Sequence, residues 1–433
     1  MAIITIPAGS TTEFLQNAIN GADKGDIIEF QGNMNLTSAV IIVDKELTMR
    51  STEGKNSVLT QTIEDTRHFT IGADAAVSMH NVTLNGGSIG GGVRISATSG
   101  TLNMYEGSVI SNCYNASKGG GILNSGTFNM KGGEISGNFA GNDGGGINCP
   151  YPSSEIYAVL VIDSGIISGN TAQKGGGVYS FGTFVMNNAT ISGNTAVTES
   201  GGVHNDGTFT MNNGTISNNT AGTNGGGVHN YDIFNMNGGE ISGNFAGKDG
   251  GGIHSSRKNV NISSGSIVNN TATDDGGGVW KYDLNCLTVA AGVIFSGNSA
   301  CSTTHRDPAN NDVYRANIRG TVWSVGRQGY NNTDINQDGA PFLPIDISDS
   351  ALLIGNGTDD SNRGNAFIFD FNGNAFAHSS FISNGADYAE MFEWADGNPT
   401  DEDRVGYFVT LEGGKIRKAN AEDEFVLGVV SVE

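Results

Sequence analysis

Apolar and polar residues alternate in short runs through the middle of the chain, and these runs return at a nearly fixed interval. In residues 208–211, for example, threonine alternates with phenylalanine and methionine, and glycine or asparagine bounds the run. A two-residue period between such bounding residues predicts short β-strands and tight turns, whereas a helix would repeat every 3.6 residues. The array is therefore predicted to be all-β.

The runs belong to a repeated block in which glycines precede a valine or isoleucine. That apolar residue recurs at intervals of 25 to 31 residues, at Val93, Ile122, Ile147, Val178, Val203, Val228, Ile253 and Val279. A period of this size marks an array in which each unit buries its apolar residues only against its neighbours. Three short strands per block predict one turn of a right-handed parallel β-helix.

Other positions of the block suit this fold. A phenylalanine (Phe128, Phe184, Phe209 and Phe234) would stack inside successive turns. The asparagine of Ile-Ser-Gly-Asn (Asn138, Asn170, Asn194, Asn219 and Asn244) tolerates a left-handed backbone and can bond its copy in the next turn. Glycines let the chain turn without a Cβ clash. A low-complexity glycine-rich linker would not keep its apolar residues in phase.

The ends of the chain depart from the repeat. Residues 1–30 predict a cap containing a short helix, because Thr11 and Glu13 precede helically spaced apolar residues. Residues 31–302 are the predicted β-helix, with regular turns from about residue 80, and about eleven turns at ~4.8 Å would span ~50 Å.

Residues 303–349 are a connector. Residues 350–383 contain Asn372-Gly373 between alternating aromatics, which predicts a hairpin too small to fold alone and hence three copies around one axis. Residues 384–433 form a last segment.

Charge and composition exclude several classes of partner. The net charge is −22 and no basic run exceeds two residues, which disfavours nucleic acid and anionic membranes. No apolar stretch is long enough to span a membrane, and the first residues do not resemble a signal peptide. The four cysteines form no C-x-x-C pair and suit buried positions in a protein assembled in a reducing cytosol. We expect neither a cofactor nor a bound metal.

One register position gathers aromatic and imidazole side chains. It is occupied in successive blocks by Tyr179, His204, His229, His254 and Trp280. We interpret His204, His229, His254 and Trp280 as an outward face that stacks with sugars, or as a by-product of block duplication. A metal site built from the stacked histidines is a further alternative.

Carboxylates just before the glycines offer a second candidate site. They are Asp143, Glu199, Asp249 and Asp275. Glycoside hydrolysis needs two carboxyl groups, ~5–5.5 Å apart for retention or ~6.5–9.5 Å for inversion, which neighbouring turns could supply. The position varies among acid, lysine and asparagine, which indicates a solvated loop.

Two parts of the chain resemble known families. The Gly-Gly-Gly-(Val/Ile) and Phe-x-Met-Asn words resemble the pectin-lyase-like β-helix repeats of bacterial surface adhesins and phage tail proteins. Residues 385–390 (Gly-Ala-Asp-Tyr-Ala-Glu), 392–398 and 403–409 resemble the start of the self-processing intramolecular chaperone domain of phage tail appendage proteins. This resemblance implies a homotrimer and a domain that can cut itself off near Ala-Asp-Tyr-Ala-Glu.

The resemblance also implies site residues. Asp387, Glu390 and Glu393 would supply carboxylates for self-cleavage, although Asp387 and Glu390 could instead cap a turn or pair with Arg404 or Lys415. The chain stops at Glu433, where family members continue. We therefore expect the chain to stay whole.

These features together suggest a function. The chain is expected to be a structural and receptor-binding tail spike or fibre of a phage or phage-like injection particle. It would be assembled in the bacterial cytoplasm, with tail or baseplate proteins and a host-surface polysaccharide as partners. The alternatives are a glycan-degrading tailspike, hydrolase or lyase, and a bacterial adhesin, which would need an export signal or anchor.

Overall fold

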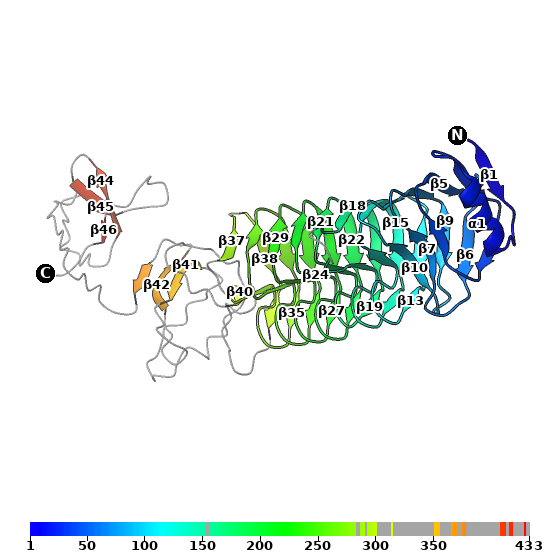
Figure 1. Ribbon diagram of the computed structural model, residues 1–433. Helices are drawn as coiled ribbons and strands as arrows, with labels where there is room; N and C mark the ends of the chain where they lie inside the picture. Colours follow the sequence, from blue (N-terminus) through cyan, green and yellow to red (C-terminus); the bar gives the residue numbers. More distant parts are fainter. Residues whose placement is uncertain are drawn as a thin grey trace. The chain divides into compact units, whose positions relative to one another are not determined.

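The structure is a computed structural model of the chain. It describes residues 1–300 except 153–155, 283–285 and 291, and then the backbone of strands β40 to β46. The chain divides into two units, residues 1–321 and 322–433 (Figure 1). The described residues are nearly all β, with a single short helix. No helix among them is long and apolar enough to cross a membrane.

Unit 1 is a solenoid of about 12 turns, in which every strand pairing is parallel. The first strand of each turn joins one long sheet. These strands are β1 (Ile3–Ile6), β2 (Ile27–Phe30), β5 (Glu46–Ser51), β8 (Ala76–His80), β11 (Thr101–Met104), β15 (Thr127–Ser136), β18 (Val159–Ser168), β21 (Thr183–Met186), β25 (Thr208–Met211), β29 (Ile233–Met236), β33 (Val260–Ile262) and β37 (Leu287–Val289).

The second strand of each turn lies in the same sheet, because β15 and β18 continue through both positions. The remaining second strands are β3 (Met34–Leu36), β6 (Ser57–Gln61), β9 (Val82–Asn85), β12 (Val109–Ser111), β22 (Ala189–Ser192), β26 (Gly214–Ser217), β30 (Glu240–Ser242), β34 (Ser266–Val268) and β38 (Ile294–Ser296). A two-residue strand follows at the corner in eight turns: β13 (Tyr114–Asn115), β16 (Phe139–Ala140), β19 (Thr171–Ala172), β23 (Thr195–Ala196), β27 (Thr220–Ala221), β31 (Phe245–Ala246), β35 (Thr271–Ala272) and β39 (Ser299–Ala300).

The third face is an 11-stranded sheet that carries the candidate site. Its strands are β4 (Val40–Ile42), β7 (Arg67–Ile71), β10 (Gly91–Ile95), β14 (Ile122–Asn124), β17 (Ile147–Cys149), β20 (Val178–Ser180), β24 (Val203–Asn205), β28 (Val228–Asn230), β32 (Ile253–Ser255), β36 (Val279–Lys281) and β40 (Val313–Tyr314). These three faces confirm the predicted parallel β-helix, including three main strands per repeat.

Equivalent apolar residues stack inside the solenoid. Phe184, Phe209 and Phe234 pair in register, and their ring centroids are 4.4 and 4.9 Å apart. The valine or isoleucine of the third strand is likewise fully buried in the regular turns, as at Val203 and Val228. Burial of such side chains is worth about 1.5–3 kcal/mol each, so the repeated apolar positions are the main source of stability.

The predicted asparagine ladder runs along one corner of the solenoid. The side-chain amide of Asn194 donates to Oδ1 of Asn219 at 2.9 Å, and that of Asn219 donates to Oδ1 of Asn244 at 3.0 Å. Each amide also donates to a carbonyl of the preceding turn, as from Asn219 to Ile191. The ladder extends from Asn138 to Asn298 and is buried throughout.

The glycines allow adjacent turns to approach each other closely. Gly225 has a φ of +71°, a left-handed conformation that favours glycine. Gly227 has an ordinary φ, but a Cβ placed there would lie 2.6 Å from the carbonyl oxygen of Gly252 in the next turn. The glycine segment therefore recurs at the same place in successive turns, because its backbone forms hydrogen bonds directly with the glycine segment of the next turn.

The N-terminal segment differs from the prediction in one respect. The expected cap helix is present as α1 (Thr12–Gly21), and the Thr11 side chain accepts a hydrogen bond from the Phe14 amide. However, β1 precedes α1 and pairs in parallel with β2, so the solenoid already begins within the predicted cap. Leu15 and Ile19 turn inward, whereas Phe14 is exposed.

Unit 2 contains two small antiparallel sheets. One consists of β41 (Ser350–Gly355), β42 (Asn365–Asp370) and β43 (Ala375–Ala377), and the other of β44 (Phe408–Glu412), β45 (Lys415–Lys418) and β46 (Gly428–Val429). The pairing of β42 with β43 confirms the hairpin predicted around Asn372-Gly373.

Candidate functional site

The aromatic and imidazole side chains form one continuous ladder along the third face. Tyr179, His204, His229, His254 and Trp280 are the middle residues of β20, β24, β28, β32 and β36, and the strand register aligns each with the next. Successive ring centroids lie 4.3, 5.2, 4.4 and 4.2 Å apart. The predicted common register is therefore confirmed. We call these five side chains the ring ladder.

The histidines of the ring ladder are buried, which contradicts the expectation of an outward face that stacks with sugars. The flanking residues Val203 and Asn205 are buried on the inner side of the strand, so His204 between them points outward, yet His204 and His229 are each only 1% exposed and His254 is 5% exposed. Neighbouring rings cover them, including Tyr231, whose ring stacks on His229 at 4.5 Å. A sugar cannot stack on a covered imidazole. Among the five rings of the ladder, only Trp280 is partly exposed.

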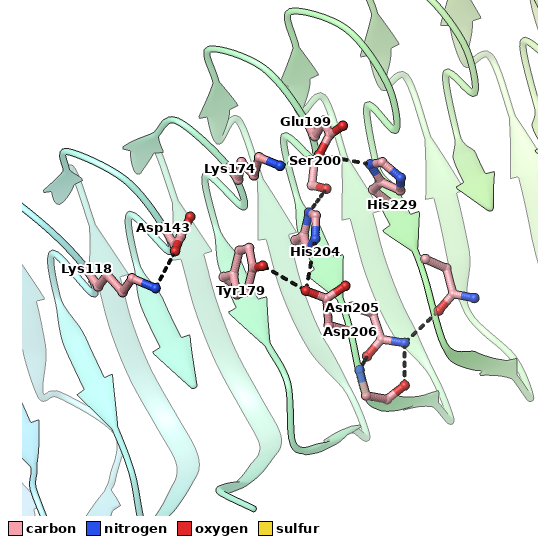
Figure 2. A network of polar contacts seen from close by, with 12 residues as sticks. Lys118, Asp143, Lys174, Tyr179, Glu199, Ser200, His204, Asn205, Asp206 and His229 are labelled. Carbon is pink, nitrogen blue, oxygen red and sulfur yellow. Dashed lines mark hydrogen bonds and ion pairs between the residues drawn. The ribbon is translucent and has the colours of Figure 1, made fainter. Parts of the chain in front are cut away.

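A polar network holds His204 in place. Its Nδ1 lies 2.9 Å from Ser200 Oγ, and its Nε2 lies 3.4 Å from Asp206 Oδ2 (Figure 2). Tyr179 donates its hydroxyl hydrogen to the same Asp206 oxygen at 2.7 Å. Serine, histidine and aspartate form nucleophilic triads in hydrolases, but Ser200 and His204 are both buried here. The network positions the ring ladder and does not present a nucleophile at the surface.

The pKa values of several groups in this network are shifted by burial and by hydrogen bonding. Burial alone would raise the pKa of Asp206, but the hydrogen bonds and charge of His204, with the Tyr179 hydroxyl, bring that pKa below its usual value. Burial, reinforced by the bond to Asp206, raises the pKa of Tyr179. Burial, with the nearby His254, His204 and Lys174, holds the pKa of His229 well below its ordinary value. His229 is therefore a neutral imidazole at pH 7.

The position before the glycines forms a second ladder beside the first. Its side chains in successive turns are Lys118, Asp143, Lys174, Glu199, Asn224, Asp249 and Asp275. Lys118 pairs with Asp143 at 2.8 Å and Lys174 with Glu199 at 2.9 Å (Figure 2). This arrangement explains the alternation of lysine and acid in the first four members, because opposite charges on adjacent turns face each other.

The interpretation of this position as a solvated loop is wrong for its last members. Asp249 and Asp275 are buried, on adjacent turns. Burial raises the pKa of Asp249, and the negative charges of Asp275 and Asp274 add to this, although Lys248 at 3.3 Å opposes it. The lysine pairs at Asp143 and Glu199 make those carboxylates poor candidates for acid catalysis of glycan hydrolysis.

The two ladders bring a possible metal-ligand set together. One ligand atom each of Glu199, His204 and His229 lies within 4.8 Å of the other two. In the described part of the chain, neither ring nitrogen of His229 has a hydrogen-bond partner, and its Nδ1 lies 4.0 Å from Glu199 Oε2.

Sequence reasoning missed Ser200, Asp206 and Tyr231, which surround His204 and His229. A signal for Ser200 was present, because this serine replaces the first glycine of the triplet found in neighbouring turns, and it adopts a φ of +68°. Nothing in the sequence indicated that Asp206 and Tyr231 fold back towards the ring ladder. The predicted self-cleavage residues Asp387, Glu390 and Glu393 lie outside the described residues.

Comparison with known proteins bears on the C-terminal part. Residues 358–433 match the family Peptidase_G2, described as the IMC autoproteolytic cleavage domain. The match confirms the domain type expected from residues 385–409, and it begins earlier, within the predicted 350–383 segment. The β-solenoid and this domain match fit a phage tail spike with a C-terminal self-cleaving domain. No curated protein and no solved structure matches the chain.

Proposed function

We propose that this chain is a structural and receptor-binding component of a phage tail or related injection particle. The observation that carries the proposal is the autoproteolytic domain match at residues 358–433, placed after a parallel β-solenoid. These two features support a tail spike or fibre kind of protein. Host recognition, the particle and its tail or baseplate partners are the proposed part.

The proposed ligand is a host-surface polysaccharide. The chain as a whole is acidic, with a net charge of −22, which suits a neutral or cationic glycan better than an anionic one. Since His204 and His229 are covered, the aromatic contact available on the ring ladder is Trp280, beside Tyr282, which is 75% exposed. Both rings can stack on the apolar face of a sugar.

A cell-binding assay tests this role. Labelled protein should bind host cells, and Trp280→Ala combined with Tyr282→Ala should weaken binding. Tyr151→Ala is the control, because Tyr151 is also exposed but lies away from Trp280 in the chain. Unchanged binding by the double variant would remove the ring ladder from the proposal, and absence of wild-type binding would contradict receptor recognition.

A glycan-degrading tailspike is the competing function. The described structure gives it one feature, the adjacent buried carboxylates Asp249 and Asp275. Incubation with host cell-wall polysaccharide separates the two functions. Release of reducing ends or of unsaturated sugars would favour a hydrolase or a lyase respectively, whereas the binding role predicts neither.

We also propose a single self-cleavage event, which the family's description as an autoproteolytic domain supports. This departs from our sequence-based expectation of a chain that stays whole. If the bond between Ala386 and Asp387 breaks, intact-mass measurement should show loss of residues 387–433 from the 44.9 kDa chain. Asp387→Asn and Glu390→Gln should each abolish this loss while the solenoid stays folded. A full-length mass after assembly would contradict cleavage.

A further inference from the structure

The cluster of Glu199, His204 and His229 combines the donor atoms of a transition-metal site. Two imidazole nitrogens and one carboxylate oxygen lie within 4.8 Å of one another, and all three residues are buried or partly buried. Histidine and carboxylate ligands with a fourth, open position are the set that zinc takes in many proteins, at about 2.0–2.2 Å per ligand. Hard cations such as Ca²⁺ prefer six to eight oxygens instead.

The cluster spans two turns of the solenoid. Glu199 and His204 belong to one turn, and His229 is the in-register partner of His204 in the next turn. The strand pairing between β24 and β28 fixes the spacing of the two imidazoles, so a metal needs only small side-chain rotations to draw the three ligands together. Because rigid strands carry both histidines, the backbone need not move.

His229 is the observation that points to a ligand. Its side chain is 1% exposed, and neither ring nitrogen has a hydrogen-bond partner among the described residues. Buried polar atoms without partners are rare in folded proteins, since each costs about 1–3 kcal/mol. In Figure 2 the His229 ring is directed towards Glu199, with Nδ1 4.0 Å from the carboxylate oxygen. A metal ion between them would satisfy one nitrogen of this imidazole.

His204 already has partners that would orient a metal-bound imidazole. Ser200 lies at one ring nitrogen and Asp206 at the other, so either nitrogen can bind the ion while the remaining one keeps a polar contact. A carboxylate on the distal nitrogen of a metal-bound histidine fixes the ring and strengthens its donor character. The Tyr179 hydroxyl holds Asp206 in this position.

Lys174 is the competitor for this site. Its ammonium lies 2.9 Å from Glu199 Oε2, the same oxygen that faces His229. A divalent ion and the ammonium would repel each other at this oxygen, so Lys174 lowers the affinity of the site and has to swing away when metal binds. Lys174 has its side chain 42% exposed, which leaves it free to do so.

We propose that Glu199, His204 and His229 form a binding site for Zn²⁺ or a similar divalent transition metal, which joins two adjacent turns of the solenoid. The site is distinct from the receptor-binding role. Its effect would be to stabilise the array at the middle of the ring ladder.

Titration of the untagged, chelator-treated full chain with Co²⁺ and then Zn²⁺ tests the proposal. One Co²⁺ per chain should give visible absorption bands of nitrogen and oxygen ligation, and Zn²⁺ should displace it and raise the unfolding temperature. Ca²⁺ and Mg²⁺ should do neither. No stoichiometric binding, or an intense near-ultraviolet thiolate band that assigns the ion to a cysteine, would overturn the proposal.

Variants locate the ion. His229→Asn and Glu199→Gln should each weaken binding by at least about 10-fold, and Asp206→Asn by about 10-fold or more through loss of orientation. His254→Asn is the matched control, because His254 lies on the same ladder outside the cluster, and it should bind as wild type. Wild-type affinity in His229→Asn would overturn the assignment.

Lys174→Gln keeps the test decisive if a ligand variant fails to fold. Removal of the competing ammonium should strengthen binding, and a gain of affinity cannot come from unfolding. Lys118→Gln is its matched control, because Lys118 makes the same ion pair with Asp143 two turns away. Equal affinity of Lys174→Gln and wild type would contradict a site at Glu199.

Discussion

At the scale of single residues, the buried asparagines show how this chain satisfies polar groups inside its solenoid. Asn219 donates to Asn244 Oδ1 and to the Ile191 carbonyl, and its own Oδ1 accepts from the backbone and side-chain amides of Asn194. All these groups are buried. One side chain therefore links its own turn to the turn before it and the turn after it.

Asn219→Ala should destabilise the solenoid strongly. The change leaves the Asn194 amides and the Ile191 carbonyl without this partner, at a cost of about 1–3 kcal/mol for each buried group that water cannot reach. The unfolding midpoint in denaturant measures the loss. Asn212→Ala is the matched control, because Asn212 makes the same kind of amide ladder on the exposed side and should change stability by about 0.5 kcal/mol or less. Equal losses in the two variants would contradict this account.

Ser200 combines a strained backbone with a hydrogen bond to His204. Its φ of +68° costs a residue with a Cβ about 1–2 kcal/mol, whereas glycine adopts it freely. Ser200→Ala keeps the strain and loses the bond, and Ser200→Gly loses the bond but relieves the strain. We therefore expect Ser200→Gly to be more stable than Ser200→Ala by about 1 kcal/mol in thermal unfolding. The reverse order would show that backbone strain at this position is not significant.

At the scale of elements, the ring ladder makes stability depend on pH. Burial, with the charges of Lys248 and Lys281, lowers the pKa of His254 to about 3, against 6.5 in an unfolded chain. The rings of His229 and Trp280 flank the His254 ring. Between pH 6.5 and 3 the unfolded chain therefore binds a proton at this position that the folded chain does not. Above pH 6.5 His254 therefore does not lower the free energy of unfolding, and below pH 6.5 that free energy decreases as the pH falls.

His254→Phe should reduce that dependence. Phenylalanine can still stack on Trp280 but takes up no proton, so the variant should lose about 2–3 kcal/mol less than wild type between pH 7 and pH 4.5. Unfolding midpoints across this range measure the difference. His80→Phe is the control, because His80 stacks on Tyr105 at 4.1 Å but is only partly buried, and it should change the slope less. Parallel pH profiles for wild type and His254→Phe would refute the explanation.

The repeat itself was predictable from the sequence, and the shell around the ring ladder was not. The spacing of Val203 and Val228 fixes the register of their strands, and so the alignment of His204 with His229 follows from counting residues. Whether an outward ring is covered depends on turns that lie before and after the strand. Tyr231 and Asp206 occupy such turns, and no periodicity marks them. The first strand, β1, was missed because a helix separates it from its partner.

At the scale of the whole molecule, the expected assembly is a homotrimer. The antiparallel sheet of β41, β42 and β43 is small, and sheets of this size gain stability by packing against further copies. Sedimentation of the full chain should give a particle of three chains that persists on dilution. A stable monomer in dilute solution would contradict the trimer, and the solenoid and the domain match would stand without it.

The direct pairing of like residues between turns has a consequence for how such a protein can change length. Val203 and Val228 begin the equivalent strands β24 and β28, and each of them follows a pair of glycines. A recombination that removes residues 203–227 would join Gly202 to Val228 in phase and shorten the solenoid by ~4.8 Å. Insertion of a copy would lengthen it by the same step. Deletion or duplication of one block in the gene can thus change the length of the solenoid by whole turns, while the sequences of both ends stay the same.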